Sequence, residues 1–213
     1  MHPADVELLQ QWRNGDMVAG EILFERYYDL VARFFRGKVP TDIADLVQET
    51  FVACVEGRDR LQEDSSFRAY IFSVARNVLC AHLRDKYRDD AKVEVDFDAT
   101  SVQDLAPGPI SQIVNRHEQR LLLEALRRIP VNFQILLELR YWEQLKTADI
   151  AEALGVPHGT VRTRLAKARQ LLDQAMSTMA DSAALLESTM ANFEEWARQC
   201  RNLDLIADPV SSG

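Results

Sequence analysis

A chain of 213 residues is long enough for one large domain or two small ones. Because 47% of its residues are hydrophobic, it can form packed cores, and this composition excludes a chain that is disordered over its whole length. Its 33 acidic and 25 basic residues give a net charge of −8, which by itself argues against a polyanionic partner. No run of 18 apolar residues suggests a transmembrane helix, the N-terminus lacks a signal-peptide pattern, and three scattered cysteines form no zinc motif. We therefore expect a reduced, cytoplasmic protein with no metal site and no cofactor.

The N-terminal part of the chain shows helical periodicity with short breaks. A helical pattern over 5–38 is interrupted by a Gly-Asp turn. A second helix is expected to begin at Thr41 or Asp42, either of which can serve as N-cap, and to run to about Val55. A third helix follows the serines at 65 and 66 and is expected over 67–87.

The middle of the chain loses this periodicity. Residues 89–110 contain six acids, one lysine and an Ala-Pro-Gly-Pro run, which together predict a linker. A helical pattern resumes at 111 and persists to about 203, with breaks at 129–130 and 155–157. We see no internal repeat and no strand-like alternation.

These elements predict an all-α protein with two small helical domains joined by an irregular acidic linker, the second domain containing a helix-turn-helix. The expected domains cover 1–88 and 111–175, with the linker over 89–110. A helical C-terminal extension with a frayed end is expected over 176–213.

The extension carries apolar residues at alternating spacings of four and three from Met179 to Cys200, a heptad-like seam. Three interpretations stay open. The extension packs back on the chain, it regulates by covering a surface or by receiving a partner protein, or it forms a homodimeric coiled coil.

Two basic segments stand out against the acidic total. Residues 68–88 hold five cations and one acid, and residues 158–169 hold four cations and no acid. The second segment follows a short helix that Thr147 can cap and a turn at Gly155. On it, one stripe is expected to be buried: Val161, Leu165, Ala168 and Leu172.

The other face of that helix carries hydroxyls and cations, which can reach base edges and phosphates from a major groove. The pattern therefore predicts a DNA-binding helix-turn-helix. The alternative is a plain helical hairpin with a solvated basic face.

The helix over 42–55 has two contrasting faces. Its core face is expected to hold Val47, Phe51, Cys54 and Val55. The opposite face combines acids, an amide and a valine: Asp45, Gln48, Glu49, Val52 and Glu56. An exposed valine among polar residues indicates a protein-docking surface, and an ordinary solvated face is the alternative.

The helix over 67–87 is the second informative stretch. Its buried stripe is expected to contain Phe67, Ile71, Val74, Ala75 and Val78. Its outward face combines a ring, a hydroxyl, an amide and cations: Tyr70, Ser73, Asn77 and Arg84, with Arg76 alongside. Such a set suits melted nucleic acid, because a ring can hold an unstacked base, an amide can bond its edge and cations can hold phosphates. Alternatively, Tyr70 belongs to the core.

Together these motifs resemble the extracytoplasmic-function (ECF) group of bacterial RNA polymerase sigma factors, within the sigma-70 family. The residues that resemble the family's second region are Gly15-Asp16, Asp45-Leu46-Val47-Gln48-Glu49-Thr50-Phe51, Phe67-Arg68-Ala69-Tyr70-Ile71 and Val74-Ala75-Arg76-Asn77. Those that resemble the fourth region are Ile129-Pro130, Leu139-Arg140-Tyr141, Asp149-Ile150-Ala151, Leu154-Gly155, Gly159-Thr160-Val161, Arg164-Leu165 and Lys167-Ala168-Arg169. The likeness covers about 5–175, with the motifs in the family's order.

The resemblance implies a transcription initiation factor that binds core RNA polymerase and directs it to promoter DNA. The residues implied in polymerase binding are Asp45, Leu46, Gln48, Glu49 and Val52. Those implied in reading the melted −10 element are Phe67, Arg68, Tyr70, Ser73, Arg76, Asn77 and Arg84, with the loop 62–66. Those implied in reading the duplex −35 element are His158, Gly159, Thr160, Arg162, Thr163, Arg164 and Lys167.

The resemblance also implies that the acidic linker threads through the polymerase, and that an anti-sigma factor or other regulatory protein is a partner. The chain departs from the family pattern in three places. Tyr70 replaces the usual Trp, Gly20 replaces the Phe that usually follows Ala19, and residues 176–213 continue past the usual end.

Two other classes of function fit the sequence less well. A stand-alone helix-turn-helix regulator would need a sensing domain with a pocket, whereas 42–88 shows a docking face and a basic aromatic helix. For an enzyme we find no phosphate loop, no metal-ligand spacing and no Ser or Cys paired with His, so no catalytic residue is expected.

Overall fold

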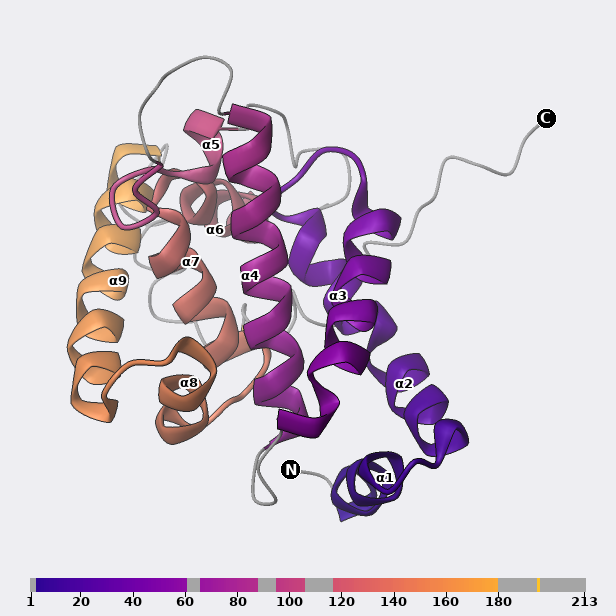
Figure 1. The fold of residues 1–213 in the computed structure, drawn as a ribbon. Coiled ribbons are helices and arrows are strands. Elements are labelled where there is room, and N and C mark those ends of the chain that lie inside the picture. The colour runs from indigo at the N-terminus through magenta and orange to yellow at the C-terminus, as the bar shows by residue number, and fades with distance from the viewer. Residues whose placement is uncertain (1–2, 61–65, 88–94, 106–116, 180–194, 196–213) are drawn as a thin grey trace. The chain divides into compact units, whose positions relative to one another are not determined.

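The computed structural model describes residues 3–60, 66–87, 95–105, 117–179 and 195 (Figure 1). Within these ranges the chain is helical apart from turns and one isolated β-bridge, which confirms the all-α prediction. The described residues form two compact units. The first unit holds the residues up to 95 together with 146–158, and the second holds 96–145 and the residues from 159 onward.

The first unit is built from helices of both sequence halves. Its helices are α1 (Pro3–Arg13), α2 (Met17–Arg36), α3 (Ile43–Gly57), α4 (Phe67–Tyr87) and α8 (Thr147–Leu154), with a 3₁₀ turn over Arg58–Arg60. The predicted Gly-Asp turn separates α1 from α2. There the Asp16 carboxylate caps α2 by accepting hydrogen bonds from the backbone N–H groups of Val18 and Ala19, at 2.9 and 3.2 Å.

Two further helix starts were expected from polar residues. Asp42 is the N-cap of α3, as predicted, but its carboxylate accepts a hydrogen bond from the Thr41 hydroxyl at 2.9 Å and none from the helix. Ser66 precedes α4 and its Oγ accepts a hydrogen bond from the Ala69 N–H at 3.3 Å. The helix boundaries therefore follow the polar residues that the sequence offered.

Aromatic rings fill the core of the first unit. The fully buried Phe67 ring of α4 lies edge-on to Tyr27 and Trp12, with centroid separations of 5.1 and 6.0 Å. The buried carboxylate of Asp5 is paired with Arg26 and accepts a hydrogen bond from the Tyr27 hydroxyl at 2.8 Å. Burial and this hydrogen bond raise the pKa of Tyr27. These contacts join α1, α2 and α4 into one core.

Two cysteines are buried free thiols, as expected of core residues. Burial raises the pKa of the Cys54 thiol to about 12 and also raises that of Cys80. Neither thiol is therefore a reactive thiolate near neutral pH.

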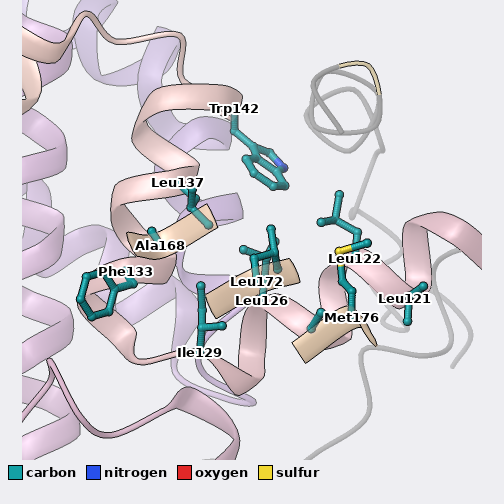
Figure 2. Packing of buried hydrophobic residues seen from close by; sticks show 11 residues of the cluster. Leu121, Leu122, Leu126, Ile129, Phe133, Leu137, Trp142, Ala168, Leu172 and Met176 are labelled. Carbon is teal, nitrogen blue, oxygen red and sulfur yellow. The ribbon is translucent and has the colours of Figure 1, made fainter. Parts of the chain in front are cut away.

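The second unit is also a helical bundle. Its elements are α5 (Val102–Leu105), α6 (His117–Arg128), α7 (Val131–Leu137), a π-helical turn (Glu138–Trp142) and α9 (His158–Met179). Figure 2 shows its core, where Leu122 and Leu126 of α6 meet Leu172 and Met176 of α9. The predicted stripe of α9 is confirmed at Val161, which is fully buried, and at Leu172.

Part of the predicted linker is folded rather than irregular. Within 95–105, Phe97 and Val102 are buried, and the carbonyls of Phe97 and Thr100 accept hydrogen bonds from the first N–H groups of α7, at Asn132 and Val131, both at 3.0 Å. The start of a helix leaves such N–H groups without partners, so this segment completes α7. The acidic composition of this segment did not indicate that Phe97 and Val102 would be buried.

Two smaller expectations also need correction. Val55 was expected in the core of α3, but it is exposed because the buried stripe runs through Val47, Thr50 and Cys54, a third of a turn away. Thr147 was expected to cap α8, but Lys146 is the N-cap. There, the Asp149 carboxylate accepts a hydrogen bond from the Lys146 N–H at 3.3 Å.

Several predictions fall outside the described residues. They are the loop 62–65, the domain boundaries at 88 and 110, and the extension from residue 180, apart from Glu195. The boundary expected at 175 lies within α9, whose last residue, Met179, packs against the core of the second unit.

Candidate nucleic-acid and protein interfaces

The predicted protein-docking surface lies on α3. The side chains of Asp45, Gln48, Glu49 and Val52 are exposed, and that of Val52 is 50% exposed; we call these four residues the α3 face. Leu46, which was grouped with them, is only 3% exposed and belongs to the core. Its burial is a consequence of helical geometry, because Leu46 and Val47 both lie on the side that packs inward.

The α4 residues predicted to contact melted DNA divide into two groups. Phe67 is fully buried in the aromatic core and does not reach the surface. The half-buried Tyr70 donates a hydrogen bond from its hydroxyl to the Cys54 carbonyl at 3.2 Å, and Ser73 donates one to the Tyr70 carbonyl at 2.8 Å. These three side chains therefore contribute to the fold of the first unit.

The polar residues further along α4 are the ones that face solvent. Asn77 and Arg84 are exposed, and the Arg76 guanidinium lies 3.5 Å from the Asn77 side-chain oxygen. Arg68 is half-buried, with its guanidinium 5.9 Å from the centroid of the Tyr27 ring. The outer surface of α4 thus offers an amide and cations, and its aromatic ring is turned inward.

The predicted helix-turn-helix is present along the chain. After α8 ends at Leu154, Gly155 adopts a left-handed φ of 63°, and the Val156 N–H donates to the Ala151 carbonyl at 3.0 Å before α9 begins. Glycine suits this position because other residues are strained at positive φ. The α8 helix and this turn belong to the first unit, and α9 belongs to the second unit from residue 159.

The candidate residues on α9 are mostly exposed. Gly159, Arg162, Thr163 and Lys167 face solvent, and Thr160 is half-buried. The Thr163 hydroxyl donates to the Gly159 carbonyl at 3.3 Å, so the helix retains it along its own surface. His158 is exposed, and its Nε2 lies 2.8 Å from the Thr147 hydroxyl oxygen. The basic face of α9, which we define as residues 160, 162, 163, 164 and 167, is thus available over about two turns.

One cation of this face is already paired. The Arg164 guanidinium lies 3.4 Å from a carboxylate oxygen of Asp98, in the folded part of the predicted linker. The other oxygen of Asp98 accepts a hydrogen bond from the Asn132 side chain at 2.8 Å, and the Asp98 N–H donates to Asp96 at 2.9 Å. These contacts hold the Asp98 carboxylate in place beside the Arg164 guanidinium.

The role of Asp98 was not predicted individually from the sequence. The sequence showed that the linker is acidic, but it did not indicate which of the acids would lie beside a cation of α9. Arg169, the fourth cation of the basic segment, donates a hydrogen bond to the Tyr141 hydroxyl at 3.2 Å and so packs on the second unit.

Comparisons with known proteins match two separate parts of this chain to one family. The family model described as Sigma-70 region 2 matches residues 23–89, and the one described as Sigma-70, region 4 matches residues 119–172. The ECF RNA polymerase sigma-E factor of Escherichia coli (strain K12) is 28% identical over 184 residues, covering 82% of this chain and 95% of the relative. The sigma-E factor of Haemophilus influenzae is 27% identical over 183 residues, covering 82% and 96%.

Solved structures show the same kind of likeness. CnrH in complex with the cytosolic domain of CnrY matches with a TM-score of 0.59 and 25% identity, over 84% of this chain and 99% of that chain. The sigma factor RpoE in complex with the anti-sigma factor NepR, from Bartonella quintana, shares the fold with a TM-score of 0.56 and 18% identity, over 76% and 98%. Among the helices described here, none is both long and apolar enough to cross a membrane.

Proposed function

Because the chain belongs to the extracytoplasmic-function group of the sigma-70 family, and is a transcription initiation factor that directs RNA polymerase to promoters, we propose that three surfaces divide this work. The α3 face binds core polymerase, the exposed amide and cations of α4 hold the melted −10 element, and the basic face of α9 reads the duplex −35 element. Sigma factors are not enzymes, and we assign this chain no catalytic residue.

The observation that supports this division most strongly is the basic face of α9. In a chain of net charge −8, its cations stand outside a helix whose opposite side, through Val161 and Leu172, is anchored in a core. Exposed Arg and Lys on a rigid helix can bond guanine edges and phosphates. The Asp98 pair with Arg164 gives the DNA-free protein a carboxylate that DNA must displace.

The −10 surface is proposed with a narrower set of residues than the sequence alone suggested. Asn77 is exposed and can bond a base edge, while Arg76 and Arg84 can hold phosphates. Phe67, Tyr70 and Ser73 act through the fold by fixing α4 against the rest of the first unit.

The α3 face suits a protein partner because a half-exposed valine is surrounded by polar groups that can complete its rim. We propose core polymerase as that partner, in the cytoplasm. The similar solved structures hold CnrY and the anti-sigma factor NepR, so we also propose a regulatory protein of that class for this chain.

Co-elution with bacterial core polymerase tests the α3 face. The full chain is expected to co-elute, and Val52→Asp to lose about tenfold or more in affinity, because it places an extra charge in the centre of the interface. Val18→Asp is the matched control: it changes another exposed valine, on α2 and outside the α3 face. Equal loss in both variants, or in neither, would remove the α3 face from the proposal.

A further inference from the structure

A cavity of about 650 Å³ opens on the first unit among α1, α2 and α3. Its walls are aromatic, formed by the rings of Trp12, Phe24, Tyr28 and Phe51. The Phe24 and Phe51 rings are stacked, with centroids 4.8 Å apart. This volume lies in the range of small-molecule sites, which are mostly apolar with few polar groups.

The charged residues that line this cavity are all acidic. Glu21, Glu25 and Asp29 line it at intervals of four residues along α2, so their carboxylates form a row about 12 Å long. None of the three makes an ion pair within the described part of the chain, and no lysine or arginine occurs among the described lining residues. Rings beside unpaired carboxylates favour a cation, which both groups attract.

A buried hydrogen-bond donor lies at the base of the cavity. The Trp12 indole is fully buried, and its Nε1–H has no partner among the residues that the structure describes. The indole edge that carries Nε1 lies directly against Gly20, where a Cβ would overlap it, and both residues line the cavity. A buried donor left without a partner is unfavourable, so an acceptor supplied by a ligand would be stabilised there.

We propose that this cavity binds a small organic cation with an aromatic body and a hydrogen-bond acceptor. The rings hold the body, the α2 carboxylates hold the cationic group, and Trp12 Nε1 donates to the acceptor. None of the residues that line the cavity belongs to the α3 face or to the basic residues proposed for DNA on α4 and α9, so the site does not depend on the roles proposed for them.

The chain's own C-terminal extension is a poor occupant. Residues 176–213 contain six acids and two arginines, so this segment would be repelled by the carboxylate row. A basic amphipathic helix from another protein would neutralise the carboxylates of α2. Because such a helix would lie on the surface, it could not accept a hydrogen bond from the buried Nε1–H of Trp12. That helix is therefore an outcome that the experiment must separate from the small cation.

The probe is 5-methoxytryptamine, which supplies a ring, an ammonium group and an ether oxygen. The full ¹⁵N-labelled chain is titrated while the indole N–H cross-peaks are followed, with Trp12 assigned through its backbone. We expect a saturable shift of the Trp12 cross-peak. 5-Methoxyindole-3-acetate has the same ring and ether but the opposite charge. We expect the chain to bind it at least about tenfold more weakly, a difference of about 1.4 kcal/mol.

Two variants remove the same net charge from different places. Glu25→Gln with Asp29→Asn is expected to weaken binding of the cation about tenfold. Glu7→Gln with Glu56→Gln changes exposed acids outside the cavity and is expected to leave binding unchanged. Equal binding of cation and anion, an equal effect of both variant pairs, or no Trp12 shift up to about 5 mM probe would overturn the proposal. Binding of a lysine-rich amphipathic peptide in place of the probe would overturn it as well.

Discussion

Both α4 and α9 were predicted to contact DNA, but their candidate side chains differ in whether they face the protein or the solvent. On α4 the ring and the hydroxyl of Tyr70 and Ser73 turn to the protein, and only the amide and the cations remain outside. On α9 the candidate side chains stay outside, and one of them, Arg164, is paired with Asp98. Residue type therefore predicts a surface well where long cations are involved, and poorly where aromatic rings are involved, because a ring gains more from burial.

The largest expected effect tests whether Phe67 belongs to the fold or to the DNA surface. Phe67→Ala should destabilise the first unit by about 3–5 kcal/mol, because it removes the centre of the aromatic core. Denaturant unfolding of the full chain measures this loss. Arg84→Ala, at an exposed position of the same helix, should change stability by no more than about 0.5 kcal/mol. An unaltered stability of Phe67→Ala, with loss of promoter melting, would place Phe67 on the DNA surface.

The second prediction compares two arginines of α9. Arg162→Ala should weaken binding of the polymerase complex to promoter DNA by about 1–3 kcal/mol if it bonds a base edge. Arg169→Ala removes the same charge, but the Arg169 side chain is hydrogen-bonded to the Tyr141 hydroxyl. We therefore expect a clearly smaller loss of affinity for promoter DNA. Affinity measured at several salt concentrations separates base contacts from phosphate contacts, since each lost phosphate contact lowers the slope by about 0.9. Equal losses would mean that the hydrogen bond to Tyr141 does not keep Arg169 from contacting DNA.

The third prediction concerns Tyr70, which stands where the family usually has tryptophan. Tyr70→Phe removes the hydrogen bond to the Cys54 carbonyl and should cost about 1 kcal/mol of stability. Promoter melting by the folded fraction should remain as in the unmodified chain, because the ring is retained. If melting falls while the unfolding transition does not move, the hydroxyl of Tyr70 contacts DNA.

The smallest expected effect concerns the linker carboxylate. Asp98→Asn should raise affinity for −35 duplex about two- to fivefold, because a partly exposed ion pair contributes about 0.5–1 kcal/mol. Asp96→Asn removes the same charge two residues away and should have less effect. The gain should vanish in an Arg164→Ala background and shrink at high salt. A gain that persists without Arg164 would show that the pair does not mask the helix.

The sequence was sufficient for helices α2, α3, α4 and α9 and for most of the buried stripe of α9, because each depends on local spacing. It was insufficient where the partner is distant in sequence. Phe97 and Val102 look like isolated apolar residues in an acidic linker, whereas in the structure both are buried and the N–H groups at the start of α7 bond the carbonyls of Phe97 and Thr100. Likewise, the sequence showed Gly20 only as a departure from the family pattern, whereas in the structure its missing Cβ leaves room for the Trp12 indole.

The three-surface proposal is tested most directly by run-off transcription with purified core polymerase and the full chain. Templates carry a promoter that core polymerase alone does not use, either intact or with the −35 or the −10 element replaced. The account predicts transcripts from the intact promoter, loss of −35 dependence in Arg162→Ala, and no transcripts with Val52→Asp. Tight binding to duplex DNA by the chain alone, with neither polymerase association nor transcripts, would contradict it and favour a stand-alone regulator.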